Sequence, residues 1–172
     1  MGDFISNPST KVFIGIVAKT HQRREKEIFD TVVLRVDKVL RGPIKGKHVG
    51  IILRSDEASI LPIDGTRVLV LTGSAKSPYL PVAHDLGFAP LNQTNYATLI
   101  SCAQSSLDFV NSPDQAGRIN AMRRLRQLAT PCDGGAVVKS LVDKFCGAGD
   151  SDLARRQCIA DHQPGMTLPG LL

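Results

Sequence analysis

The chain has 172 residues, of which 42% are hydrophobic and 22% charged, and its formal net charge is +5. This length suits one domain, or one domain with an appendage, and the composition is that of a globular rather than a disordered protein. The sequence contains no apolar run that approaches the length of a membrane-spanning helix.

The first half of the chain alternates apolar and polar residues with the period of two that is typical of β-strands. Gly15 and a change of parity near Lys38 predict two β-bulges, which bend strands as a closing barrel requires. The last strand is expected at an edge, because Pro81 cannot donate a hydrogen bond to a neighbouring strand. Strands are predicted over Val12–Ala18, Ile28–Leu40, His48–Arg54, Arg67–Thr72 and Tyr79–His84.

After Pro90 the apolar residues recur at helical spacing instead. Ser112 is expected to cap the second helix, with Pro113 at its first position. Helices are predicted over Tyr96–Val110, Pro113–Ala129 and Val137–Phe145, and from Asp150 or Ser151 through Ile159. Five short strands followed by helices indicate an all-β unit with a helical appendage.

A five-stranded, partly open antiparallel barrel is the OB architecture. The sequence therefore predicts an OB-like β-barrel over residues 1–92. A helical C-terminal segment over residues 93–172 is expected to pack on or beside this barrel.

This chain contains three short motifs, at Val12–Val17, Val36–Pro43 and Asp64–Leu71. They resemble runs in the first, second and fourth strands of the netrin-module/TIMP-like OB superfamily. The resemblance covers residues 11–90 and implies an OB fold and a tendency to bind other proteins. TIMP-type inhibitors resemble one another in a free N-terminal cysteine that chelates a protease zinc. Here no cysteine precedes Cys102, so no inhibitory residue is carried over.

The four cysteines all lie in the C-terminal part of the chain: Cys102, Cys132, Cys146 and Cys158. An even number confined to one segment favours two disulfides, although three pairings are open and buried, reduced thiols are the alternative. No C-x-x-C spacing occurs, so a zinc site or redox pair is not expected. Disulfides favour an extracytoplasmic location, periplasmic or secreted, with Met1-Gly2 replacing a removed leader. The alternative is a cytoplasmic protein.

The sequence offers no recognisable catalytic or metal site. None of the four histidines, His21, His48, His84 and His162, has a second ligand at a recognised metal spacing, and all four are interpreted as surface residues. No G-x-S-x-G or equivalent nucleophile motif is present. We therefore expect no enzymatic activity, no metal and no cofactor.

Basic residues cluster in the two connections that follow the first and second strands: Lys19, Arg23, Arg24, Lys26, Arg41, Lys45 and Lys47. OB folds bind ligands near these places, so these residues are the candidate binding surface, with a merely solvated surface as the simpler interpretation. The arginines of the second predicted helix, Arg118, Arg123, Arg124 and Arg126, are expected to project mostly outward.

These observations favour a non-enzymatic binding module of OB type whose partner is another protein. The alternative is a single-stranded nucleic-acid-binding OB protein. Single-strand binders stack bases on exposed aromatic rings, and aromatic residues are only 5% of this chain, with Phe13 and Phe29 expected in the core. Oligomeric state and the identity of the partner are not encoded in any motif.

Overall fold

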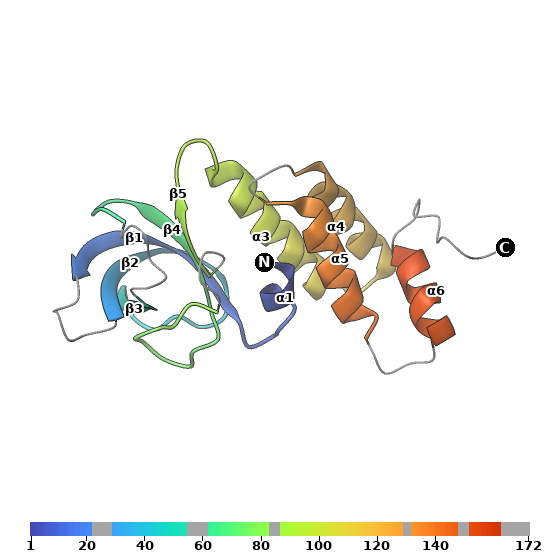
Figure 1. Ribbon diagram of the computed structural model, residues 1–172, viewed down its shortest axis with the longest axis horizontal. Helices are drawn as coiled ribbons and strands as arrows, with labels where there is room; N and C mark the ends of the chain where they lie inside the picture. Colours follow the sequence, from blue (N-terminus) through green and yellow to red (C-terminus); the bar gives the residue numbers. More distant parts are fainter. Residues whose placement is uncertain (22–28, 55–61, 83–86, 129–131, 148–151, 163–172) are drawn as a thin grey trace.

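The computed structural model describes residues 1–21, 29–54, 62–82, 87–128, 132–147 and 152–162. Figure 1 shows the strands gathered in one half of the molecule and most helices in the other. The strands are β1 (Lys11–His21), β2 (Phe29–Arg41), β3 (His48–Arg54), β4 (Arg67–Thr72) and β5 (Phe88–Leu91). They form one antiparallel sheet in the order β3-β2-β1-β4-β5.

The sheet is not closed into a barrel by its five strands, because β3 and β5 do not pair with each other in the described part of the chain. The prediction of a fifth strand over Tyr79–His84 is wrong as far as that segment is described, and the fifth strand is Phe88–Leu91 instead. Residues 79–82 make two isolated bridges, a parallel one from Tyr79 to Ile51 and an antiparallel one from Pro81 to Thr72. Pro81 has no N–H for a continuous ladder, which limits this segment to single bridges.

A single register shift lies at both predicted irregularities of the first strand pair, Gly15 and the change of parity near Lys38. The register between β1 and β2 shifts between Ile14, which pairs with Lys38, and Gly15, which pairs with Val36. A Cβ atom added to Gly15 would lie 2.9 Å from the Cβ of Leu34. Glycine is therefore needed here because the Leu34 side chain occupies the space that a Cβ atom would take.

Both faces of β1 are buried in the first part of the strand, up to Val17, except that Ile16 is half-buried. On the inner side of the curled sheet, Phe13 and Val17 pack with apolar side chains of β2, β3 and β4 and with Tyr79. On the outer side, Val12 and Ile14 pack with Leu69 and Leu71 of β4. This layer is covered by the following residues of helix α1 (Gly2–Ile5), strand β5 and helix α3 (Tyr96–Asn111): Ile5, Leu91, Leu99, Ala103 and Leu107.

The four predicted helices are present as α3 (Tyr96–Asn111), α4 (Gln115–Gln127), α5 (Gly134–Phe145) and α6 (Asp152–His162), and a short helix not predicted from the sequence, α1 (Gly2–Ile5), precedes the sheet. The N-cap of α4 is Asp114 rather than Ser112, because the Asp114 carboxylate accepts a hydrogen bond from the N–H of Gly117 at 2.7 Å. Within the described residues, none of the helices combines the length and apolar character that crossing a membrane demands.

Two disulfides connect the helices, so one of the three open pairings is selected. Cys102 of α3 bonds Cys132, just before α5, and Cys146 at the end of α5 bonds Cys158 of α6. Cys102, Cys132 and Cys146 belong to a core that also contains Phe109, Met122 and other apolar residues of α3, α4 and α5. The disulfides therefore staple a small helical core that is separate from the inner core of the sheet.

Candidate functional site

The outer face of the sheet is covered over β1 and β4 but open over β2 and β3. Inward-facing residues of β2, such as Val32 and Leu34, are buried, while the alternate residues Val33 and Arg35 are half-buried and exposed. Side chains that alternate along a strand point to opposite faces. The open half of the sheet is therefore the face that carries Val33 and Arg35.

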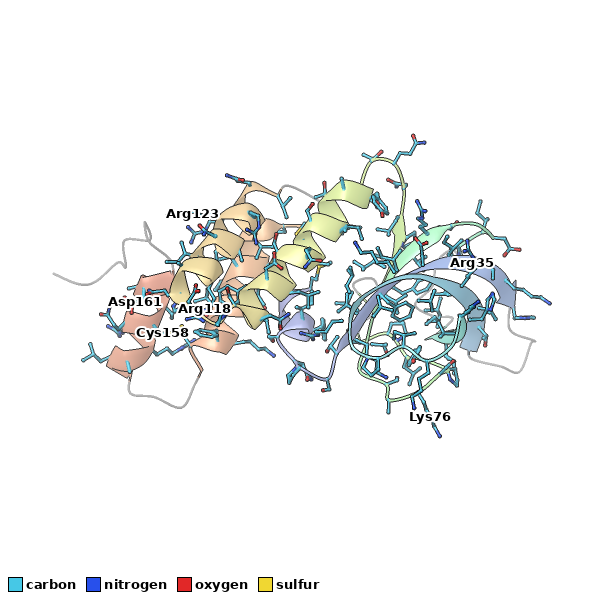
Figure 2. The ribbon with its side chains drawn as sticks, turned by 180° about the vertical axis from the view of Figure 1, so that it is seen from behind. Arg35, Lys76, Arg118, Arg123, Cys158 and Asp161 are labelled. Atoms are coloured by element: carbon cyan, nitrogen blue, oxygen red, sulfur yellow. A yellow bond between two sulfur atoms is a disulfide. The ribbon has the colours of Figure 1, made fainter. Side chains whose placement is uncertain are left out.

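Four positively charged or titratable side chains lie on this open half, and we call them the basic face: Lys19, Arg35, Lys38 and His48, all exposed. The strand register brings them together, because Arg35 pairs with Ile16 on one side and with His48 on the other, while Lys19 pairs with Val33. Directly paired residues of neighbouring strands have Cβ atoms about 5 Å apart. Figure 2 shows Arg35 at the outer surface of the curled strands.

The acidic residue that lies between Arg35 and Lys38 in the sequence forms an ion pair with an arginine. Asp37, in the bulge of β2, lies 3.4 Å from the Nε atom of Arg67 on β4. Asp30 is buried and on the inner side of β2. Among the described residues, none of the strand partners of the basic-face residues is acidic. No carboxylate at these paired positions therefore neutralises the positive charge of the basic face.

The structure distributes the predicted basic residues unevenly. Lys19 lies on the basic face, and Lys45 and Lys47 are exposed in the turn that leads into His48. The three remaining residues of the first connection lie outside the described part of the chain: Arg23, Arg24 and Lys26. The grouping of the candidate surface therefore stays a prediction for those three residues.

Arg41 has a different environment from the other predicted residues. Its Nε donates to the carbonyl oxygen of Thr10 at 2.8 Å and its Nη1 to that of Ile5 at 2.7 Å, and Nη2 donates to the carbonyl of Asn7. Desolvation by burial lowers the pKa of Arg41 from its ordinary value. Its guanidinium thus ties the N-terminal segment to the end of β2.

Sequence reasoning missed Arg35 and Lys38 as members of the basic surface. A signal was present: Arg35 occupies an alternate position of a strand whose intervening residues are apolar. Lys38 follows a bulge, so its face could not be assigned without the register.

A second cluster of chemically capable side chains lies between α4, α5 and α6. His162 is only 6% exposed, so the interpretation of this histidine as a surface residue is wrong, while His21 and His48 are exposed as predicted and His84 lies outside the described residues. The Nε of Arg118 donates to Nε2 of His162 at 3.1 Å, and Nδ1 of His162 lies 2.8 Å from the carbonyl oxygen of Cys158.

The prediction that the α4 arginines project outward is wrong for Arg118. Its guanidinium lies over the ring of Phe145, at 4.6 Å, and also donates to the Ser112 carbonyl. Arg124 pairs with Asp108 of α3 at 2.8 Å. Figure 2 shows Arg118 beside Cys158 and Asp161 at the far end of the helical half, and Arg123 at its surface.

Cys146, Cys158 and His162 bring their ligand atoms within 4.8 Å of one another. The sequence signal for this cluster is the spacing of Cys158 and His162, four residues apart on one helix, which places both side chains on the same face. In the structure the two sulfurs are bonded to each other, and a bonded pair does not supply thiolate ligands.

The sequence matches no protein-family model, and the comparison with curated proteins gave no match either. The functional argument therefore rests on the residues and their arrangement.

Proposed function

We propose that this chain is a non-enzymatic binding module of OB type that works outside the cytoplasm and binds an acidic segment of another protein. The observation that carries the proposal is the basic face: Lys19, Arg35 and Lys38 project from an open half of the sheet with no carboxylate in their described rows. Arrays of one charge steer oppositely charged partners and set the specificity of contact.

The OB assignment is supported by the two isolated bridges of residues 79–82. Tyr79 exchanges hydrogen bonds with β3, because its N–H donates to Gly50 and its carbonyl accepts from the N–H of Ile52. The N–H of Val82 donates to Leu71 of β4. This segment therefore links the edge of β3 to the end of β4 through single bridges, on the side where a partly open barrel would close.

The proposed location is supported by the two disulfides, which form and persist in oxidising compartments. Both fasten the helical part of the chain rather than the sheet.

A protein partner is favoured over single-stranded nucleic acid by the chemistry of the basic face. Apolar side chains separate its charges, and they are the aliphatic residues Ile16, Val33 and Ile52 rather than aromatic ones. Bases need aromatic rings on which to stack. Phe13, one of the two aromatic residues considered from the sequence, is fully buried in the inner core, and the side chain of Phe29 lies outside the described residues. An acidic peptide with apolar residues between its carboxylates fits this alternation better.

The test compares two labelled probes, an oligoglutamate peptide and an oligothymidine of equal charge, by fluorescence anisotropy over a range of salt concentrations. We expect the peptide to bind at low ionic strength and the affinity to fall as salt screens the exposed charges. The nucleic acid is expected to bind no more tightly than the peptide. Tighter, base-dependent binding of the oligothymidine would favour the alternative function.

The decisive variant reverses the charge at Lys19→Glu, Arg35→Glu and Lys38→Glu together, and we expect it to lose peptide binding. Its matched control makes the same change of net charge on the helices, at the exposed residues Arg123, Arg126 and Lys139. If both triple variants lose equal affinity, binding depends on net charge alone and the assignment to the basic face is wrong.

A further inference from the structure

The cluster of Cys146, Cys158 and His162 has the composition of a soft-metal site, independently of the proposed function. Two cysteines and one histidine are ligands that Zn²⁺ accepts in tetrahedral sites with an open fourth position. They come from two helices: Cys146 caps the C-terminus of α5, and Cys158 and His162 lie one turn apart on α6. The three ligand atoms lie within 4.8 Å of one another.

The distances suit one metal ion once the sulfurs are separate. Sγ of Cys158 lies 3.9 Å from Nδ1 of His162. In a tetrahedral zinc site with bonds of about 2.3 Å to sulfur and about 2.0 Å to nitrogen, those two ligand atoms are about 3.5 Å apart and two sulfurs about 3.8 Å apart. Two changes are needed: the Cys146 sulfur moves away from Cys158, and the His162 ring turns so that Nδ1 leaves the Cys158 carbonyl oxygen, which lies 2.8 Å from it.

The surroundings support ligands of this kind. Phe109 and Phe145 contact the ring of His162, with centroids 6.5 and 5.1 Å away, and shield it from water. The Arg118 guanidinium contacts the cluster through His162, because its Nε donates to Nε2 of that ring. Two thiolates and one Zn²⁺ have no net charge, so Arg118 does not repel the filled site.

We propose that the reduced form of this protein binds one Zn²⁺ through Cys146, Cys158 and His162, and that formation of the Cys146–Cys158 disulfide abolishes this site. A dithiol reductant breaks the S–S bond, gives two hydrogens to the protein sulfurs and becomes a cyclic disulfide itself. Binding of Zn²⁺ then displaces the two thiol protons to solvent. The proton of His162 moves from Nδ1 to Nε2, and Arg118 gives up its hydrogen bond to Nε2.

The test titrates Zn²⁺ into the full chain, oxidised and dithiol-reduced, in competition with a chromophoric chelator, and repeats the titration with Co²⁺ to record thiolate charge-transfer absorption. We expect one Zn²⁺ per reduced chain and none per oxidised chain. His162→Gln should weaken binding by about tenfold or more, since even the loss of an outer partner of a metal ligand costs that much. The matched control His48→Gln changes an exposed histidine and should bind like the unaltered protein.

A second measurement uses the unaltered chain. The reduced chain is alkylated with and without Zn²⁺, and the modified cysteines are located by mass spectrometry. Protection of Cys146 and Cys158, but not of Cys102 and Cys132, is the expected result. Protection of the other pair, or no zinc binding by the reduced chain, would overturn the proposal.

Discussion

Removing the two disulfides separately should have unequal effects on stability. The Cys102–Cys132 bond spans 30 residues and the Cys146–Cys158 bond spans 12. A longer closed loop restricts the unfolded chain more, and the loop-entropy relation gives about 3.6 kcal/mol for the longer loop and about 2.8 kcal/mol for the shorter one at 25 °C.

Packing increases this difference. Cys102 is fully buried and Cys132 nearly so, in the core of α3, α4 and α5, so their replacement by alanine also leaves a cavity. Of the other pair, Cys146 is buried in the same core, but Cys158 is only half-buried and fastens α6, whose side chains are mostly exposed. The double variant Cys102→Ala/Cys132→Ala should therefore lose at least about 1 kcal/mol more than Cys146→Ala/Cys158→Ala.

The assay is urea unfolding of both oxidised double variants, followed by far-ultraviolet circular dichroism. The midpoint and slope are compared with those of the unaltered chain, because the slope reports the surface exposed on unfolding. A smaller slope is expected for Cys146→Ala/Cys158→Ala, since α6 separates before the rest unfolds. An equal or larger loss of stability in that variant would refute the reasoning from loop length and burial.

Three further substitutions test local features, and urea unfolding measures each. Arg41→Met should cost about 2 kcal/mol, because backbone carbonyls lose a charged donor, and protease cleavage of the N-terminal segment should quicken; an unchanged cleavage rate would contradict the anchoring role. Gly134→Ala should cost about 3 kcal/mol or more, because the added Cβ would lie 1.6 Å from the Leu125 carbonyl oxygen, whereas Gly135→Ala, with its nearest contact at 3.9 Å, should be neutral or slightly stabilising. Asp114→Ala should cost about 1 kcal/mol through loss of the α4 N-cap, and an Asp114→Asn variant that lost as much would contradict the capping argument.

The elements that sequence patterns predicted well are those with long, regular periods. The strands β1 to β4 and the helices α3 to α6 each repeat a pattern over several residues, and period is the strongest local signal. Gly15 could be assigned to a bulge because a glycine in the interior of an apolar strand often marks such a bend.

The elements that were missed or misplaced depend on contacts between distant residues. Strand β5 has four residues and contains Pro90, so it shows no periodic pattern. The buried position of His162 depends on the rings of Phe109 and Phe145 and on a hydrogen bond from Arg118, 44 residues away. Spacing along the chain cannot reveal such a partner, although the interval between Cys158 and His162 could have raised the question.

The choice among the three cysteine pairings also depended on the packing of the helices. Cys102 lies in the middle of α3, and α5 could approach it only because Gly134 lets the start of α5 lie against the end of α4. A Cβ at this place would collide with the Leu125 carbonyl oxygen, so the start of α5, two residues after Cys132, would have to move. The disulfide and the glycine therefore support the same helix crossing.

Arg41 contributes to the stability of the fold and also holds the segment that covers part of the outer sheet face. Its guanidinium holds Ile5 and Thr10, and the apolar Ile5 of α1 then packs over the outer side of β1 and β4. Lys38, three residues earlier on β2, pairs with Ile14 at the border of this covered area and is exposed. The hydrogen bonds of Arg41 thus help to hold α1 in place beside the basic face. Substitution of Arg41 should consequently disturb both folding and binding, whereas substitution of Lys38 should affect binding alone.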